Sequence, residues 1–225
     1  EPHNVQDIFR NKYGDCKDQA LLLVTMLRTA GIKAYPVLVS TKGHYGLYKD
    51  FPMMMFNHAI AATILDGKTV FMDPTAETCS FGDLPTPDHD REVLILGEYG
   101  YKIEKTPLFQ ASHNLLKQEM RIKIKEDGSI KAEKTTFTFG IYDQAQRYRA
   151  LYTQPELIEE VIKEAIQSIS IGAQLEEYKI ENASDLDKPV VLSYKFNGPE
   201  YWTEAGNLRI MPQLAGLGTS LVAKD

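Results

Sequence analysis

The chain has 225 residues with 43% apolar and 25% charged side chains, a globular composition for one large domain or two modest ones. Its 31 acidic and 25 basic residues leave a formal charge of −6 without any Lys/Arg-rich run, so we expect no nucleic-acid binding and no polybasic membrane patch. No stretch approaches the roughly 18 continuous apolar residues of a spanning helix, so we expect no membrane-spanning segment.

The first part of the chain predicts one helix, one strand and two long loops. Apolar residues recur with the 3.6-residue period of a helix over residues 16–30. Residues 34–40 alternate loosely between apolar and polar side chains, as a strand does. We expect residues 41–56, which include Met53 to Met55, to be a loop, and residues 82–91 carry too much Pro and Asp for regular structure.

A β-hairpin is predicted between these two loops. The dipeptide Asp66-Gly67, a favoured two-residue hairpin turn, separates two β-like runs. In a hairpin with this turn Ile60 faces Asp73 and His58 faces Thr75. Side chains alternate between the two faces of a strand, so the imidazole and the Asp73 carboxylate share one face. They are then diagonal neighbours, about 7–8 Å apart at the backbone and within reach of a hydrogen bond. The two runs are residues 57–65 and 68–73.

The last part of the chain predicts a β-rich region with one long helix. An amphipathic pattern over residues 142–169 predicts the helix, and Pro155 is expected to break it. We expect Tyr201 and Trp202 to anchor the core of this region. Strands are expected at residues 117–125, 130–139, 175–180, 190–196 and 208–211.

The order of these elements predicts an α+β fold class with two domains. The pattern of predicted helices and strands changes near residue 105, and residues 106–114 are typical of a linker. We therefore expect one domain over residues 1–105 and a smaller domain of antiparallel strands with a long helix over residues 106–225. The second domain carries no recognisable catalytic arrangement, so we expect a role in packing or presentation.

Cys16 has the setting of an activated thiol, because it lies in a polar turn that leads into the predicted helix. A helix N-terminus favours negative charge through its free N–H groups and its dipole, and the thiolate is the nucleophilic form of cysteine. Gly14 is expected to give the turn conformational room. A histidine such as His58 would take the thiol proton, and Asp73 would hold that imidazole in the productive tautomer.

Five short motifs stand out around these residues. They are, in chain order, Tyr13-Gly14-Asp15-Cys16-Lys17-Asp18-Gln19-Ala20, Gly31-Ile32-Lys33-Ala34, Asn57-His58-Ala59, Asp66-Gly67 and Met72-Asp73-Pro74-Thr75. In this order and spacing they resemble the transglutaminase-like superfamily. The resemblance covers roughly residues 5–80 and implies a papain-like core in which Cys16 is the nucleophile, His58 the general acid/base and Asp73 the residue that orients His58. The whole chain is also similar to the C-terminal portion of larger bacterial proteins, which implies an extracytoplasmic location.

Two features depart from the pattern of that family. Many members carry Trp two residues after the His, where this sequence has Ile60. Only fifteen residues precede Cys16, so we expect the chain to lack an upstream part of the family core that would supply a side-chain oxyanion donor. The backbone N–H of Cys16 is the donor that remains.

The resemblance implies a cysteine-dependent enzyme that acts on protein or peptide amides. Cys16 would attack the carbonyl, and water or an amine would resolve the thioester, so peptidase, deamidase and cross-linking outcomes all stay open. The implied partner is a protein or peptide substrate, with no cofactor and no metal, and the oligomeric state stays open. The competing hypothesis is a non-catalytic protein- or glycan-binding module that keeps the fold.

Other chemistry-bearing residues have simpler interpretations. Cys16 and Cys79 allow one disulfide, which the sequence does not establish. The same two cysteines with His58 and Asp73 are zinc-capable, but no close Cys-x-x-Cys or His-x-x-x-His pair supports a metal site. Three histidines in predicted loops are expected to be solvated: His44, His89 and His113.

Overall fold

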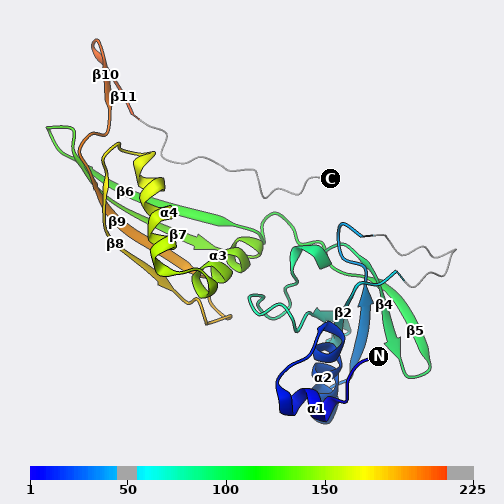
Figure 1. Cartoon of the computed structure of the whole chain (residues 1–225). Coiled ribbons are helices and arrows are strands. Elements are labelled where there is room, and N and C mark those ends of the chain that lie inside the picture. The colour runs from blue at the N-terminus through cyan, green and yellow to red at the C-terminus, as the bar shows by residue number, and fades with distance from the viewer. Residues whose placement is uncertain (45–54, 212–225) are drawn as a thin grey trace. The chain divides into compact units, whose positions relative to one another are not determined.

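The computed structural model describes residues 1–44 and 55–211, which form two compact units (Figure 1). The predicted loop residues Met53 and Met54 lie outside the described residues. The domain boundary expected at residues 105/106 stays a prediction. The first unit comprises Glu1–Leu115, Phe139–Ala145 and Asp185–Lys188, and the second comprises Leu116–Thr138, Gln146–Ser184 and Pro189–Asp225.

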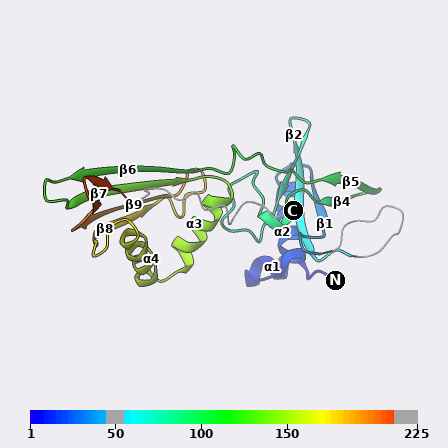
Figure 2. The same cartoon turned by 90° about the horizontal axis from the view of Figure 1, so that it is seen from above.

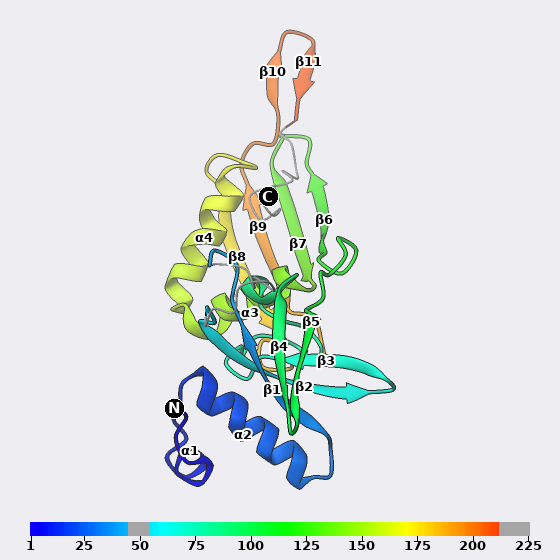
Figure 3. The same cartoon turned by 90° about the vertical axis from the view of Figure 1, so that its right-hand side faces the viewer.

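The first unit is an antiparallel sheet with helices packed on it. Its strands follow the order β3-β2-β1-β4-β5, and α2 packs against β1 and β2, with α1 beside α2 (Figure 3). The elements are α1 (Val5–Asn11), α2 (Cys16–Thr29), β1 (Ala34–Val39), β2 (His58–Leu65), β3 (Lys68–Met72), the 3-10 helix η1 (Thr86–Asp88), β4 (Glu92–Gly97) and β5 (Gly100–Lys105).

The predicted hairpin and its register are confirmed. Ala61 pairs with Met72 and Leu65 pairs with Lys68, which is the register that the sequence predicts. Asp66 and Gly67 both have positive φ angles, 49° and 75°, as a two-residue turn with the twist of the flanking strands requires. The register therefore brings the start of β2 next to the end of β3.

Strand β2 is buried on both faces, which explains its nearly continuous apolar sequence. On one face Ala61 packs with Val24 of α2 and Ala34 of β1. On the other face Ile60 packs in a cluster that includes Leu84 of the loop after β3. Side chains alternate along a strand, so His58 points to the same face as Ile60, away from α2.

The second unit is an antiparallel sheet of order β6-β7-β9-β8 with α4 on one face (Figure 2). Buried Ile158, Ile162 and Ile166 of α4 pack on a core that includes Phe196 and Tyr201, and Trp202 packs against it, so the predicted aromatic anchor is confirmed. The elements are β6 (Leu116–Ile124), β7 (Ile130–Thr138), α4 (Pro155–Gln167), β8 (Gln174–Glu181), β9 (Val191–Gly198), β10 (Thr203–Ala205) and β11 (Leu208–Ile210).

The single long helix expected in the second half is two helices. Helix α3 (Ile141–Tyr152) contributes to both units, and α4 begins at Pro155, where the sequence predicts the break. Proline has no N–H to donate, so it is tolerated in the first turn of a helix and not in the interior. Gln154 accordingly has an extended backbone and serves as the N-cap residue of α4.

The α+β fold class is confirmed, since helices accompany two antiparallel sheets. Five elements were not expected from the sequence: α1, η1, β4, β5 and β10. Helix α1 is only 7 residues long and β10 only 3, which is too short for a clear periodic signal. Within the described residues, no helix combines the length and hydrophobicity that crossing a membrane requires.

Replacing Ile60 with alanine tests the core beneath the candidate site. Ile60 is fully buried, whereas Ile64 on the same strand is 50% exposed. We expect Ile60→Ala to lower the free energy of unfolding by about 2–5 kcal/mol because it leaves a cavity. The matched variant Ile64→Ala should cost under about 1 kcal/mol. Urea unfolding followed by circular dichroism measures both, and equal losses would contradict this packing.

Candidate active site

Cys16 is the first residue of α2, and the residues around it fix the start of the helix. Asp15 is the N-cap residue, and its carboxylate accepts a hydrogen bond from the N–H of Asp18 at 3.4 Å. The Asp18 carboxylate accepts one from the N–H of Asp15 at 3.3 Å, which completes a capping box. The predicted helix start is thus confirmed, and the half-buried thiol lies in the first turn.

His3 and Gly14 support this turn in ways that the sequence did not indicate. The backbone N–H of His3 donates to the buried Asp18 carboxylate at 2.8 Å, and its Nδ1 is 2.8 Å from the other carboxylate oxygen. These bonds lower the pKa of Asp18 to about 2. A Cβ on Gly14 would lie 2.6 Å from the Cβ of Asp18, so this glycine is needed for close packing rather than for the conformational room expected from the sequence.

His58 and Asp73 form a hydrogen-bonded pair at the joined ends of β2 and β3. The Nε2 of His58 and the Oδ2 of Asp73 are 2.9 Å apart, and the side chains are 17% and 3% exposed. The other carboxylate oxygen of Asp73 accepts hydrogen bonds from the N–H and the Oγ1 of Thr75 at 2.9 and 2.7 Å. Each carboxylate oxygen therefore has a donor, which fixes the carboxylate against the imidazole.

The electrostatics of the pair favour its charged form. The hydrogen bond to Asp73 raises the pKa of His58 to about 9, although burial opposes this change. Burial would raise the pKa of Asp73, but the bonds from His58 and Thr75 outweigh it and lower that pKa. At neutral pH the pair is an imidazolium with a carboxylate, so the Nε2–H donates to Asp73.

The structure also brings Cys16 to His58. The Cys16 side chain is one of the neighbouring groups that raise the pKa of His58. The three residues expected from the sequence therefore converge, the thiol from the start of α2, the imidazole from the start of β2 and the carboxylate from the residue after β3.

Asp88 is a fourth residue at this place, and no sequence motif pointed to it. It ends η1, is 1% exposed, and its Oδ2 lies 3.9 Å from the Nε2 of His58. Burial, followed by the charge of Asp73, raises the pKa of Asp88 to about 7. Residues 82–91 were expected to be an irregular loop. The proximity of the Asp88 carboxyl to the β2–β3 hairpin arises only from the tertiary fold, because at least 15 residues of chain separate the two.

Cys79 differs from Cys16 in its environment. Both cysteines are free, so the disulfide that the sequence allowed is not formed. Burial, together with the charges of Asp83, Asp73 and Asp88, raises the pKa of the Cys79 thiol to about 12. Cys79 is therefore an ordinary protonated thiol at neutral pH.

The histidines of the predicted loops have different environments. His44 is exposed, as expected. His89 is buried, which contradicts the expectation, because its Nε2 lies 2.7 Å from the carbonyl oxygen of Leu84 and its ring packs edge-on against Phe109. His113 is 2.8 Å from a carboxylate oxygen of Asp83.

Among the described residues, one cluster of three side chains consists of residue types that bind metal ions. Ligand atoms of His58, Asp73 and Asp88 lie within 4.8 Å of one another. The Nε2 of His58 is already bound to Asp73 through its proton, which a metal ion would have to displace. We assign none of the three as a metal ligand, and the zinc-capable set considered from the sequence, with Cys16 and Cys79, is not the set that converges.

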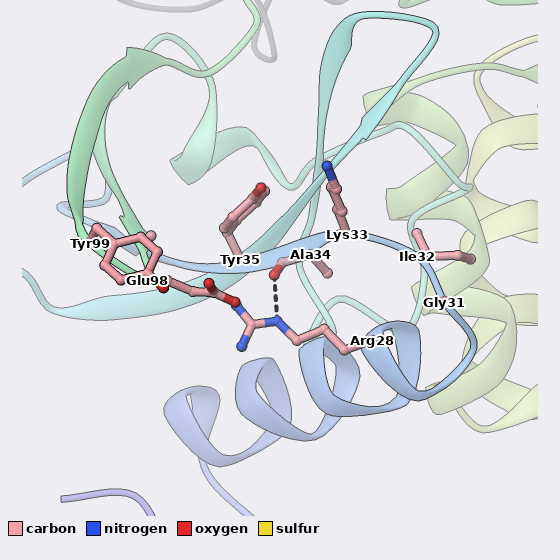
Figure 4. A pocket seen from close by; sticks show the side chains of 9 residues that line it. Arg28, Gly31, Ile32, Lys33, Ala34, Tyr35, Glu98 and Tyr99 are labelled. Atoms are coloured by element: carbon pink, nitrogen blue, oxygen red, sulfur yellow. Dashed lines mark hydrogen bonds between the residues drawn. The ribbon is translucent and has the colours of Figure 1, made fainter.

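A surface cavity of about 610 Å³ in the first unit lies apart from this group. Figure 4 shows Arg28 of α2 reaching the start of β1, where its Nε donates to the carbonyl oxygen of Ala34 at 2.9 Å. Tyr99 of the β4–β5 turn also lines this cavity. His58 pairs with the other end of β1, so the cavity does not open onto the imidazole.

A comparison with protein-family models matches residues 1–74 to the transglutaminase-like superfamily. This match confirms the resemblance seen in the sequence, and it contains Cys16, His58 and Asp73. No curated protein and no solved structure gave a match. The family match covers a third of the chain. The further similarity to the C-terminal portion of larger bacterial proteins stays a prediction.

The raised pKa of His58 predicts how stability depends on pH. Because the pKa is about 9 in the folded protein and 6.5 ordinarily, the folded state binds this proton more tightly than the unfolded chain does. The resulting stabilisation is complete below about pH 6.5 and is lost as the pH rises through about 9. We expect the free energy of unfolding of the wild type, relative to His58→Gln, to decrease over that range. Parallel urea-unfolding curves at all pH values would contradict the pairing.

Proposed function

We propose that this protein is a cysteine-dependent enzyme that transfers or hydrolyses the acyl group of protein or peptide amides. The proposal places a papain-like core in the first part of the chain, with Cys16, His58 and Asp73 as a catalytic triad. The observation that carries it is the convergence of the thiol at the start of α2 with an imidazole that Asp73 binds at 2.9 Å.

In the first step the thiolate of Cys16 attacks the amide carbonyl. The Nε2–H of His58 is engaged with Asp73, which leaves Nδ1 for the thiol and the leaving group. His58 holds the thiol proton as an imidazolium and gives it to the leaving amine when the C–N bond breaks. The carbonyl carbon is then bound to the Cys16 sulfur as a thioester.

In the second step water or an amine attacks the thioester. His58, now neutral, takes a proton from that nucleophile, and the thiolate leaves and regains its imidazolium partner. Water yields hydrolysis and an amine yields transfer to a new amide. The same three residues serve both outcomes, so the substrate that reaches the thioester decides between them.

Asp73 and the start of α2 have supporting roles in this mechanism. Asp73 fixes the tautomer of His58 and stabilises its charged form, as its hydrogen bond and the raised pKa of His58 support. The N–H groups in the first turn of a helix have no acceptor within the helix. We propose the N–H of Cys16 as an oxyanion donor, a role typically worth about 3–4 kcal/mol.

The remaining parts of the proposal come from the sequence pattern and from the family resemblance. A second domain over residues 106–225 would pack against or present a protein substrate. A bacterial origin and an extracytoplasmic location likewise stay predictions. A binding module without activity is the alternative, and the reactivity of Cys16 separates the two.

The alkylation rate of Cys16 tests the proposal. We expect iodoacetamide at about pH 6 to modify Cys16 rapidly in the Cys79→Ser protein, because a neighbouring imidazolium increases the reactivity of a cysteine. His58→Ala in the same background should slow the reaction at least about tenfold. Mass spectrometry of the labelled protein gives both rates.

His113→Ala is the matched control for that experiment. His113 also contacts a carboxylate, at 2.8 Å from Asp83, but Cys16 is not among its contacts. Its removal should leave the alkylation rate unchanged. If Cys16 reacts equally fast with and without His58, the thiol has no activating partner and the binding-module hypothesis replaces the enzyme.

A further inference from the structure

Asp88 is a buried carboxyl without a conventional partner. It is 1% exposed, and neither of its carboxylate oxygens has a hydrogen-bond partner among the described residues. Its position is fixed through the backbone, because its carbonyl oxygen accepts a hydrogen bond from Thr106 Oγ1 at 2.5 Å. A buried carboxylate without a donor is costly unless it takes up a proton or faces a positive charge.

The neighbours of Asp88 offer both possibilities. Its Oδ2 lies 3.9 Å from the Nε2 of His58, whose positive charge acts on it. Asp73 lies close enough to form a side-chain hydrogen bond with Asp88 when one of the two carboxyls is protonated. Asp73 receives donors on both oxygens from His58 and Thr75, so the shared proton resides on Asp88.

We propose that Asp88 is a positioning residue of this site, a carboxyl that holds its proton against Asp73 at acid pH and, once ionised, adds a second negative charge that keeps His58 protonated. The inference rests on the proposed function only for the role that it gives to His58. In that role the ionised Asp88 maintains the imidazolium, and with it the proton for the leaving amine, as the pH becomes alkaline.

The order in which the groups ionise supports this assignment. The pKa of Asp88 is raised to about 7, while that of His58 is raised to about 9. Between these values Asp88 is negative and His58 is still positive, so the charge of Asp88 acts on the imidazolium through the whole interval. The charge of Asp88 is itself one of the causes of the raised pKa of His58.

The other charged and titratable groups around Asp88 do not supply the negative charge that Asp88 places beside His58. Cys79, on the loop after β3, has a pKa of about 12 and is neutral in this interval. Arg91, three residues beyond Asp88, directs its Nε to the carbonyl oxygen of Ser40 at 2.5 Å. His89, the next residue, has a pKa lowered by burial and stays neutral at alkaline pH. Asp73 and His58 are therefore the groups through which Asp88 acts.

The test is an NMR titration of the His58 imidazole in the whole protein, in the presence of a chelator. Asp88→Asn keeps the size of the side chain and a hydrogen-bond donor for Asp73 but never becomes negative. We expect the His58 titration midpoint to fall by about one pH unit in this variant, since an opposite charge at this distance shifts a pKa by at least that much. Asp83→Asn, which removes the carboxylate next to His113, is the matched control and should leave His58 unchanged.

An unchanged His58 midpoint in a folded Asp88→Asn protein would overturn the proposal, because a purely structural Asp88 has no effect on that titration. A second measurement needs no variant. The side-chain carbon of Asp88 in the wild type should titrate near pH 7, and a midpoint below about 5 would overturn the proposal as well. Both readouts are independent of turnover, so they remain decisive even if Cys16 proves to have no enzymatic activity.

Discussion

The hydrogen bond between His58 and Asp73 is the interaction on which the candidate site depends. It joins His58 at the start of β2 to Asp73, the residue that follows β3. The other carboxylate oxygen of Asp73 accepts two hydrogen bonds from Thr75, which hold the carboxylate in place. Its carboxylate is almost fully buried, so the surrounding protein rather than water stabilises the charge. The imidazolium state of His58 follows from this bond, and any acyl chemistry at Cys16 follows from that state.

The start of α2 alone provides little activation for the thiol. The field of a helix N-terminus stabilises a nearby negative charge by only about 0.3–1 kcal/mol at exposed positions. Asp15 and Asp18 already place two carboxylates in that field, and the lowered pKa of Asp18 keeps it ionised. A thiolate at Cys16 must therefore obtain most of its stabilisation from His58, which makes the imidazole the decisive partner.

The sequence predicted the parts of the molecule whose signals are local. The turn dipeptide Asp66-Gly67 determined the hairpin register, and the register by itself predicts that His58 lies beside Asp73. The period of α2 and the polar turn before it placed Cys16 at the start of a helix, and the structure has the helix start there. Each of these inferences uses residues that are close in the chain or are paired across a tight turn.

Features that depend on the packing of distant segments were not predicted. Asp88 lies in a Pro- and Asp-rich stretch that looks like an ordinary loop, and its burial against His58 comes from tertiary contacts. His89 was expected to be solvated for the same reason and is buried. The need for glycine at position 14 arises from the Asp18 side chain one turn later and not from its own backbone angles.

The most direct test of the proposed chemistry is to isolate the acyl-enzyme. The protein is mixed with p-nitrophenyl acetate, whose leaving group needs no proton, and quenched with acid, and the modified residue is located by peptide mass spectrometry. The account predicts an acetyl group on Cys16 that hydroxylamine removes, as for a thioester, and much less of it in His58→Ala. An unmodified Cys16, or equal acetylation in both proteins, would contradict the account.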